Sequence, residues 1–333
     1  MNLEAKLKII TEGTEEIVTK DRLKHIIETK KNPVSYWGVA PTGSPHIGYY
    51  RAIVKQMDLI KAGFRHKILI ADLHAYLDDM KSPWSEIHIR GQIYKKCFQL
   101  LGLDGPNVEY IIGSEFQLNK EYHLETLKSS ALVTCTRAIR AASEVVRITE
   151  PNVSSVLYPI MQSLDCWALD VDLAYAGIDN RHVYMLASQL LPKLGHKVPI
   201  FLFTPLGLSL SGNKKMSASD KNNKLELFAS EEEIKNKINK AFCSEGETIN
   251  NPILEYVRYL IFPRIDEFII KRSSKYGGNA SFVLYKDLEG SFKEKKVHPQ
   301  DLKNATADYL IEILKPIREY FKENKELLKT FEK

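Results

Sequence analysis

Short apolar runs alternate with segments of helical periodicity through residues 1–228. The strand-like runs lie at 34–39, 67–73, 108–115, 170–177 and 198–203. Between them, apolar residues recur about every three or four positions, as on one face of a helix. Short strands that are apolar on both faces and separated by helices predict a parallel sheet in an α/β domain. Residues 1–30 also have helical spacing and predict an N-terminal helix.

After about residue 228 the strand-like runs stop and the pattern becomes mainly helical. Ser230 is followed three positions later by Glu233, a capping-box pattern that predicts the start of a helix. A long helix is predicted from residue 298 onward, with an apolar stripe that simple core packing explains; its members are Leu302, Ala305, Leu310, Ile313, Leu314, Ile317 and Phe321. The pattern therefore predicts two domains, 1–228 and 229–333.

Composition and charge narrow the class of protein only a little. The chain has 333 residues, 44% hydrophobic and 27% charged, as is usual for a globular protein. It has no apolar run long enough to span a membrane and no signal-peptide pattern, so we expect a cytoplasmic protein. Its four cysteines are far apart, which predicts reduced thiols and no metal site. The net charge of +5 is compatible with a nucleic-acid partner.

The loop after the first predicted strand has the composition of a phosphate-binding loop. It reads Pro-Thr-Gly-Ser-Pro before His46-Ile47-Gly48, and a helical pattern follows. The N-terminus of a helix offers free N–H groups and a partial positive charge, and glycine lets backbone approach a ligand closely. His46 can donate a hydrogen bond to a phosphate oxygen. From this segment alone, an ordinary loop with a surface histidine stays an equal alternative.

A second polar segment, 211–220, follows the last predicted strand and reads SGNKKMSASD. Lys214 and Lys215 can screen phosphate charge, and Ser217 and Ser219 can donate hydrogen bonds to phosphate oxygens. Taken alone, this segment would be read as a solvated loop. Its combination with the His46-Ile47-Gly48 loop is far more specific than either segment alone.

Together the two segments resemble the signatures of class I aminoacyl-tRNA synthetases, His-Ile-Gly-His and Lys-Met-Ser-Lys-Ser. Tyr49 replaces the second histidine and Ala218 the second lysine, departures common in the subfamilies for tyrosine and tryptophan. The resemblance implies a Rossmann-like, parallel-sheet catalytic domain over 1–228 and an anticodon-binding helical domain over 229–333. The signature loop 211–220 belongs to the first domain.

The chain most resembles the archaeal and eukaryotic tyrosyl-tRNA synthetases, from about Tyr36 to Phe321. The matching strings include ADLHAYL, GSEFQL, YPIMQSLD, YGG and HPQDLKNA. The resemblance implies a tyrosine–tRNA ligase that uses ATP with Mg²⁺ and has no metal site of its own. The tyrosine carboxylate attacks the α-phosphate of ATP, and the tRNA(Tyr) ribose then accepts the tyrosyl group.

The resemblance also assigns the tyrosine pocket. Tyr36 and Asp165 would hold the phenol oxygen, since a carboxylate accepts the phenol proton and a Tyr hydroxyl can donate to that oxygen. Tyr158 and Gln162 stand seven and three residues before Asp165, on one side of a helix, and would hold the α-amino group. Without the resemblance, Tyr36 would be read as a core aromatic and Asp165 as a helix-surface charge. Two further pocket positions are His74 and Asn180, where Asn180 stands in place of an expected, longer Gln.

The expected catalytic groups are His46 and Gly48 on ATP phosphate and ribose, and Lys215, Ser217 and Ser219 on pyrophosphate. With Ala218 in place of a lysine, Lys214 or Mg²⁺ is expected to supply the missing charge. The positions expected to line the ATP site are Gly38, Pro41, Gly43, His46, Gly48, Lys214, Lys215 and Met216.

The tRNA contacts follow from the same resemblance. Tyr276 would stack on the first anticodon base and Asp301 would accept its hydrogen bonds. His298 is also expected to bind tRNA. The acceptor stem is assigned to Arg137, Arg140 and Arg181, with His182 standing where the family has Lys. A homodimer is expected through the helical region of about 118–160.

Three alternatives remain at this point. A tryptophanyl-tRNA synthetase shares the fold and mechanism, but Tyr36 with Asp165 argues against it. A non-catalytic RNA-binding paralogue would not need the two signature loops. A small-molecule nucleotidyltransferase of the same superfamily would not need the HPQDLKNA domain.

Overall fold

The computed structural model describes residues 1–145, 150–212 and 223–332. It divides into two compact units. The sheet unit consists of Met1–Gly43 and Lys55–Pro205, and the helical unit consists of Ser44–Val54 and Leu206–Lys333. The functional domain boundary expected between residues 228 and 229 stays a prediction.

The sheet unit is built on six strands in the order β1-β6-β5-β2-β3-β4. All neighbouring pairs are parallel except β1 with β6. The predicted parallel sheet is therefore confirmed. The strands are β1 (Glu16–Val18), β2 (Val34–Val39), β3 (Arg65–Ile70), β4 (Val108–Ile112), β5 (Leu173–Gly177) and β6 (Ile200–Thr204).

The prediction of one helix over residues 1–30 was wrong, because β1 lies inside that range. Gly13 adopts a positive φ of 66°, which ends the first helix without strain. The Glu15 N–H then donates to the Phe203 carbonyl at 2.8 Å and begins the antiparallel pairing with β6. An edge strand with free backbone groups gains hydrogen bonds from such a partner, and this gain outweighs local helical spacing.

β2 is the strand at which the chain direction across the sheet reverses. It pairs with β3 on one side and with β5 on the other. Ligands of open parallel sheets bind beyond the carboxyl ends of the strands at such a switch point. The Tyr36 side chain, from β2, therefore belongs to the part of the sheet where a ligand is expected.

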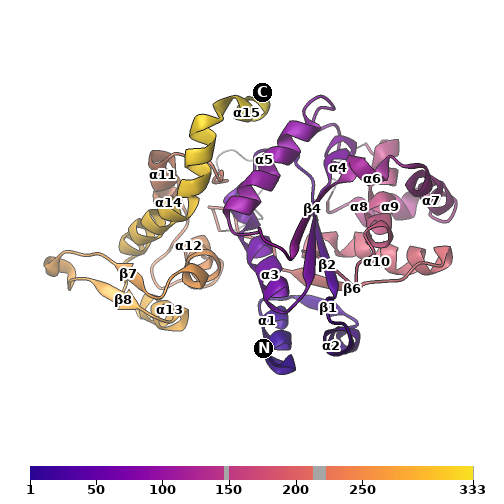
Figure 1. Ribbon diagram of the computed structural model, residues 1–333. Coiled ribbons are helices and arrows are strands. Elements are labelled where there is room, and N and C mark those ends of the chain that lie inside the picture. Colours follow the sequence, from indigo (N-terminus) through magenta and orange to yellow (C-terminus); the bar gives the residue numbers. More distant parts are fainter. Residues whose placement is uncertain (146–149, 213–222, 333) are drawn as a thin grey trace. The chain divides into compact units, whose positions relative to one another are not determined.

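Helices cover both faces of this sheet, with α5 on one face and α9 and α10 on the other (Figure 1). Trp37 packs edge-on against Phe98 of α5, while Tyr36, on the opposite face, joins a buried cluster with Tyr184 of α10. The helices are α1 (Leu3–Thr11), α2 (Lys20–Thr29), α4 (Asp72–Leu77), α5 (Ile87–Leu100), α6 (Gly113–Gln117), α7 (Lys120–Ser130), α8 (Cys135–Ala142), α9 (Val153–Ala168) and α10 (Arg181–Leu190). α3 (Tyr50–Lys61) begins in residues of the helical unit.

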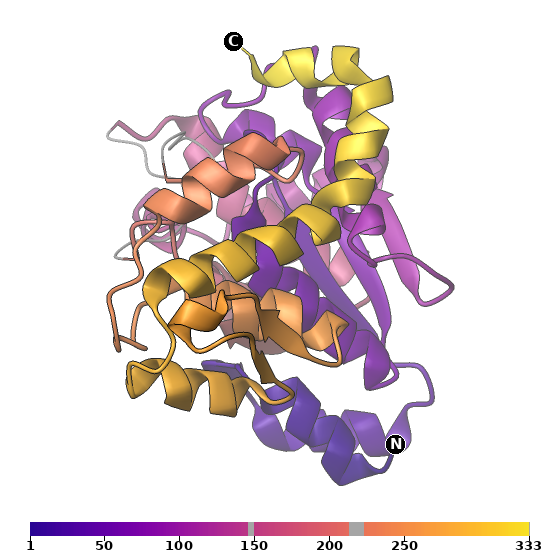
Figure 2. The ribbon, with the colours of Figure 1, turned by 90° about the vertical axis from the view of Figure 1, so that its left-hand side faces the viewer.

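The helical unit is dominated by α14, which lies alongside α11 (Figure 2). The Ser230 hydroxyl accepts a hydrogen bond from the Glu233 N–H at 3.2 Å, as the capping pattern predicted. Most of the predicted apolar stripe of α14 is buried. The helical unit also contains a short antiparallel hairpin, β7 with β8, which the sequence pattern did not predict. The elements are α11 (Glu231–Lys240), α12 (Pro252–Tyr256), β7 (Phe268–Ile270), β8 (Ala280–Phe282), α13 (Tyr285–Lys293), α14 (Pro299–Glu323) and α15 (Lys325–Leu328).

Within the described residues, no helix combines the length and the apolar character that a membrane crossing requires.

A buried carboxylate ties the start of β2 to the start of β5. Asp172 accepts a hydrogen bond from the Val34 N–H at 3.0 Å and pairs with Lys30 at 2.6 Å and with Lys197. The Asp172 side chain is 1% exposed, whereas both lysines are about half exposed. The aspartate therefore anchors the ends of two strands that flank the switch point.

We expect Asp172→Ala to lower the free energy of unfolding by about 1–3 kcal/mol, because the partly buried Val34 N–H loses its acceptor. Urea unfolding followed by circular dichroism measures the change. The matched control is Glu109→Ala, whose pairing with Arg65 at 3.8 Å is half exposed; it should cost less than about 1 kcal/mol. Equal losses in the two variants would contradict the anchoring role.

Candidate active site

The strongest candidate site in the sheet unit surrounds a carboxylate on α9. Asn152 caps this helix by accepting from the Ser155 N–H, and the helix then carries Tyr158, Gln162 and Asp165. Asp165 is 1% exposed. Burying a carboxylate is costly unless it is hydrogen-bonded, so its partners define what the site can do.

The Asp165 carboxylate accepts hydrogen bonds from two described side chains, and both bonds go to the same oxygen. Gln117 Nε2 donates to Oδ1 at 2.7 Å and the Tyr122 hydroxyl donates to the same atom at 2.8 Å. Among the described residues, Oδ2 is buried and has no hydrogen-bond partner; His74 Nε2 lies 3.9 Å away. Burial raises the pKa of Asp165 to about 7, although the bonds from Gln117 and Tyr122 act to lower it. Oδ2 is thus an acceptor held ready for a donor.

Tyr36 contributes a neutral hydroxyl to the same unit. Burial raises its pKa well above the usual value, so it stays protonated at neutral pH. The Tyr184 hydroxyl lies 3.2 Å from it and donates to it. A Cβ added at Gly38 would come within 3.3 Å of the Tyr36 hydroxyl, so this glycine leaves room for the Tyr36 ring.

Two amides and an imidazole complete the predicted pocket set. Gln162 Nε2 donates to Asn180 Oδ1 at 3.0 Å, and Asn180 Nδ2 donates to Asp179 at 2.9 Å. The shorter Asn180 is thus in direct contact with Gln162. The His74 ring meets the Tyr158 ring edge-on at 4.7 Å. Burial lowers the pKa of His74 to about 4, so the ring is neutral at neutral pH.

The loop after β2 is held from α5. Arg90 Nη1 donates to the Thr42 carbonyl at 3.2 Å, and the Tyr94 hydroxyl donates to the Gly43 carbonyl at 2.8 Å. Such contacts fix the backbone of the loop that includes the predicted ATP-lining positions Pro41 and Gly43.

His46 and Gly48 lie in the helical unit, on a segment that pairs with residues after the second signature. The Ile47 N–H donates to the Leu225 carbonyl at 2.7 Å, and the Leu227 N–H donates to the Pro45 carbonyl at 3.0 Å. His46 precedes a 3₁₀ turn, Ile47–Tyr49, that leads into α3. Its ring stacks on the Tyr49 ring with centroids 4.6 Å apart.

Side chains reinforce this backbone pairing. The buried Lys224 Nζ donates to the Ser44 hydroxyl at 2.6 Å and lies 3.2 Å from Glu226, which also accepts from Ser44 at 2.5 Å. A Cβ at Gly207 would lie only 2.8 Å from the Gly48 carbonyl oxygen, so backbone approaches Gly48 closely there. The predicted residues Lys214, Lys215, Met216, Ser217 and Ser219 lie outside the described residues.

The predicted acceptor-stem residues are on the surface of the sheet unit. Arg181 pairs with Glu16 through two bonds, Nε to Oε2 at 2.5 Å and Nη2 to Oε1 at 2.9 Å. Its neighbour His182 lies 3.5 Å from Glu144. Arg137 and Arg140 are on α8, where Arg140 is exposed and Arg137 partly so.

The predicted anticodon residues belong to the helical unit. Tyr276 is 66% exposed, and Lys275 Nζ lies 5.7 Å from its ring centroid. His298 caps α14 by accepting from the Gln300 N–H at 3.1 Å, and Asp301 stands in the first turn.

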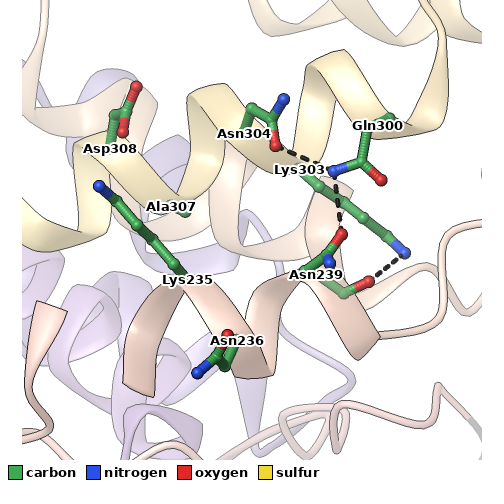
Figure 3. Close-up of a pocket in the computed structure, with 8 residues that line it drawn as sticks. All are labelled: Lys235, Asn236, Asn239, Gln300, Lys303, Asn304, Ala307 and Asp308. Atoms are coloured by element: carbon green, nitrogen blue, oxygen red, sulfur yellow. Dashed lines mark hydrogen bonds between the residues drawn. The ribbon is translucent and has the colours of Figure 1, made fainter. Parts of the chain in front are cut away.

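A polar groove of about 410 Å³ lies between α11 and α14, close in sequence to Asp301 (Figure 3). Gln300 Nε2 donates to both Asn239 and Asn304 at 2.9 Å, and Lys303 Nζ donates to the Asn239 carbonyl at 2.9 Å. The lining residues are Lys235, Asn236, Asn239, Gln300, Lys303, Asn304, Ala307 and Asp308.

Three residues of the Asp165 and Tyr36 surroundings were missed by the sequence analysis: Gln117, Tyr122 and Tyr184. Gln117 offered a usable signal, because a polar residue shortly after a strand stands at the carboxyl edge of the sheet. Tyr122 and Tyr184 offered none, since buried tyrosines in helices are usually core residues.

Comparisons with known proteins identify the class. The family described as tRNA synthetases class I (W and Y) matches residues 28–315, so the chain belongs to it. A tyrosine–tRNA ligase of Haloarcula marismortui is 42% identical over 98% of this chain and 97% of that relative. A tyrosine–tRNA ligase of Methanopyrus kandleri is 43% identical over 96% of this chain and 98% of that relative.

Solved structures agree with this membership. The tyrosyl-tRNA synthetase of Archaeoglobus fulgidus, complexed with L-tyrosine, is 41% identical with a TM-score of 0.90, covering 96% of this chain and 99% of that one. A tryptophanyl-tRNA synthetase from Giardia lamblia is 17% identical with a TM-score of 0.73, covering 99% of this chain and 91% of that one, and shares the fold. The predicted fold class and family are confirmed.

The raised pKa of Asp165 predicts a pH-dependent cost to stability. The folded state holds its proton up to about pH 7, above the usual 3.8 of an aspartate. The free energy of unfolding therefore falls as pH rises between these values. Asp165→Asn removes the ionisation and keeps an oxygen for Gln117 and Tyr122. We expect its advantage over wild type in the free energy of unfolding to be about 2–3 kcal/mol larger near pH 8 than near pH 5. Thermal or urea unfolding at both pH values measures this difference, and an equal effect at the two would contradict it.

Proposed function

We propose that this chain is a tyrosine–tRNA ligase, which joins L-tyrosine to ATP to form tyrosyl-adenylate and then transfers the tyrosyl group to the 3′-terminal adenosine of tRNA(Tyr). The observation that carries the choice of amino acid is the buried Oδ2 of Asp165, which has no hydrogen-bond partner within residues 1–145, 150–212 and 223–332. The similarity to archaeal tyrosine–tRNA ligases, which are 42–43% identical over nearly the full length of this chain, supports the same choice.

A tyrosine phenol is both a donor and an acceptor, and the pocket offers one group for each role. Its O–H would donate to Asp165 Oδ2, and its oxygen would accept from the Tyr36 hydroxyl. Phenylalanine would leave both buried groups unpaired, which is costly. The indole N–H of tryptophan can donate to Asp165 but offers no acceptor to Tyr36. Tyr158 and Gln162 would hold the α-amino group, with Asn180 acting through Gln162.

The adenylation step needs positioning and charge stabilisation more than covalent catalysis. In this proposal His46 and Gly48 contact ATP, while Lys215, Ser217 and Ser219 hold the leaving pyrophosphate. Mg²⁺ bound with ATP would add charge where Ala218 replaces a lysine. The pairing of Ser44–Ile47 with residues 224–227 supports the role of His46, because it fixes the backbone on which His46 stands.

The tRNA contacts extend the proposal. Tyr276 would stack on an anticodon base and Asp301 would accept from it. The groove between α11 and α14, lined by amides and lysines, is suited to single-stranded RNA. Arg137, Arg140 and Arg181 would contact the acceptor stem. A homodimer through residues 118–160 and a cytoplasmic location stay part of the proposal.

The first test is amino-acid-dependent ATP–pyrophosphate exchange without tRNA, comparing tyrosine, tryptophan and phenylalanine. We expect exchange with tyrosine only. Exchange with tryptophan would keep the mechanism and overturn the pocket assignment. No exchange from folded protein would favour the RNA-binding paralogue.

Lys215→Ala should slow adenylate formation by about 100-fold or more while changing tyrosine binding little, because the lysine acts on charge that develops in the transition state. Single-turnover adenylation and equilibrium tyrosine binding separate the two quantities. The control is Lys193→Ala, at an exposed lysine, which should match wild type. Equal losses in adenylation and binding would rule out a transition-state role for Lys215.

A further inference from the structure

The carboxylate of Asp165 is held asymmetrically by two residues from two other helices. Gln117 ends α6 and Tyr122 lies in the first turn of α7. Both donate to Oδ1, at 2.7 and 2.8 Å, and both are almost fully buried. A carboxylate with two donors on one oxygen cannot rotate without losing both bonds. The direction of Oδ2 is therefore fixed by Gln117 and Tyr122.

Each donor is itself anchored. The N–H of Ser114, in the first turn of α6, donates to the buried Asp72 Oδ1 at 2.8 Å, which fixes the helix that carries Gln117. Asn119 Oδ1 accepts from the Tyr122 N–H at 2.8 Å and caps α7. The two donors thus stand on capped helices, which fits a role in holding another side chain in place.

The Tyr122 hydroxyl has a second acceptor, the Met161 carbonyl at 2.8 Å. A hydroxyl has one proton, so it cannot serve both oxygens fully at once. When Asp165 is ionised, the charge-assisted bond to Oδ1 is the stronger one. When Asp165 is protonated, its proton can lie on Oδ1 and be donated to Tyr122, which then donates to Met161. In both states Oδ2 remains an acceptor, but it accepts a phenol O–H much more strongly when Asp165 is ionised, because that hydrogen bond is then charge-assisted.

We propose that Gln117 and Tyr122 are positioning residues for amino-acid specificity: they commit Oδ1 of Asp165 and keep Oδ2 as a directed acceptor for the substrate's phenol O–H. This inference rests on the proposed function. It assigns the choice of tyrosine over phenylalanine to four side chains, two that contact the phenol and two that act through Asp165.

The test uses Tyr122→Phe and Gln117→Met, which remove a donor and nearly keep the volume. The control is Tyr175→Phe, which removes a buried hydroxyl that lies 3.0 Å from the Thr204 hydroxyl on a neighbouring strand. ATP–pyrophosphate exchange gives kcat/KM for tyrosine and for phenylalanine with each protein. We expect kcat/KM for tyrosine to fall about tenfold or more in Tyr122→Phe and in Gln117→Met, the size of effect expected for one lost hydrogen bond to a charged group. In both variants kcat/KM for phenylalanine should keep its wild-type value.

The second readout is the pH at which kcat/KM for tyrosine begins to fall on the acid side. A purely structural role of Tyr122 would leave this pH unchanged. In Tyr122→Phe, Asp165 loses a bond that lowers its pKa, so the fall of kcat/KM for tyrosine should begin at a higher pH than in wild type. The other ionisable groups that face Asp165 stay neutral across this range, since burial lowers the pKa of His74 and raises those of Tyr36, Tyr122, Tyr158, Cys166 and Tyr184.

Equal falls with tyrosine and phenylalanine, or an unchanged value with tyrosine, would overturn the positioning role. Circular dichroism identifies a variant that fails to fold; such a variant is left out of the comparison, and the other of Tyr122→Phe and Gln117→Met then decides the question. Failure of the proposed function looks different, because wild-type protein would then show no exchange with tyrosine at all.

Discussion

The site depends on one buried carboxylate whose two oxygens have different roles. In a dry environment, an ionised Asp165 is stable only if hydrogen bonds replace water. Two donors satisfy Oδ1, while Oδ2 is left without a partner among the described residues. Burying the ionised carboxylate with only one oxygen hydrogen-bonded costs stability. The pKa of Asp165 is raised for the same reason, because burial disfavours the charged form. A ligand with a donor at the right place would recover this stability, so the strain in the free protein becomes binding energy for one kind of side chain.

The fold supplies this carboxylate's surroundings from several separate elements. Tyr36 comes from β2, Gln117 from the helix after β4, and Asp165 from the helix before β5. β2 and β5 flank the point where the strand order reverses, whereas the helix of Gln117 follows the edge strand β4 and reaches Asp165 through the Gln117 side chain. The buried Asp172 ties β2 to the segment that enters β5 and keeps that junction in register. Precision in the pocket therefore derives from strand ends and from helices with capped N-termini.

The sequence predicted periodic elements well and contacts between them poorly. Five strands, the long α14 and the helix carrying Asp165 follow from apolar spacing. β1 was missed because pairing with β6 outweighs local helical periodicity. Tyr36 and Asp165 were assigned through resemblance, since a buried tyrosine on a strand is ordinarily part of a core. Gln117 and Tyr122 lie 48 and 43 positions from Asp165 in sequence. Periodicity describes spacing within one helix, so it could not reveal three helices meeting at one oxygen.

The two departures from the class signatures differ in physical kind. Tyr49 replaces a histidine, and its ring stacks on His46 at 4.6 Å. An aromatic ring at this position can therefore hold the orientation of His46 through ring contact. Ala218 removes a positive charge, and no packing of an alanine can replace a charge near phosphate. The first departure is compensated within its own turn. In the proposed mechanism the second departure requires a cation from elsewhere, so the dependence of adenylation on Mg²⁺ and on Lys214 is where we expect this chain to differ from relatives with the second lysine.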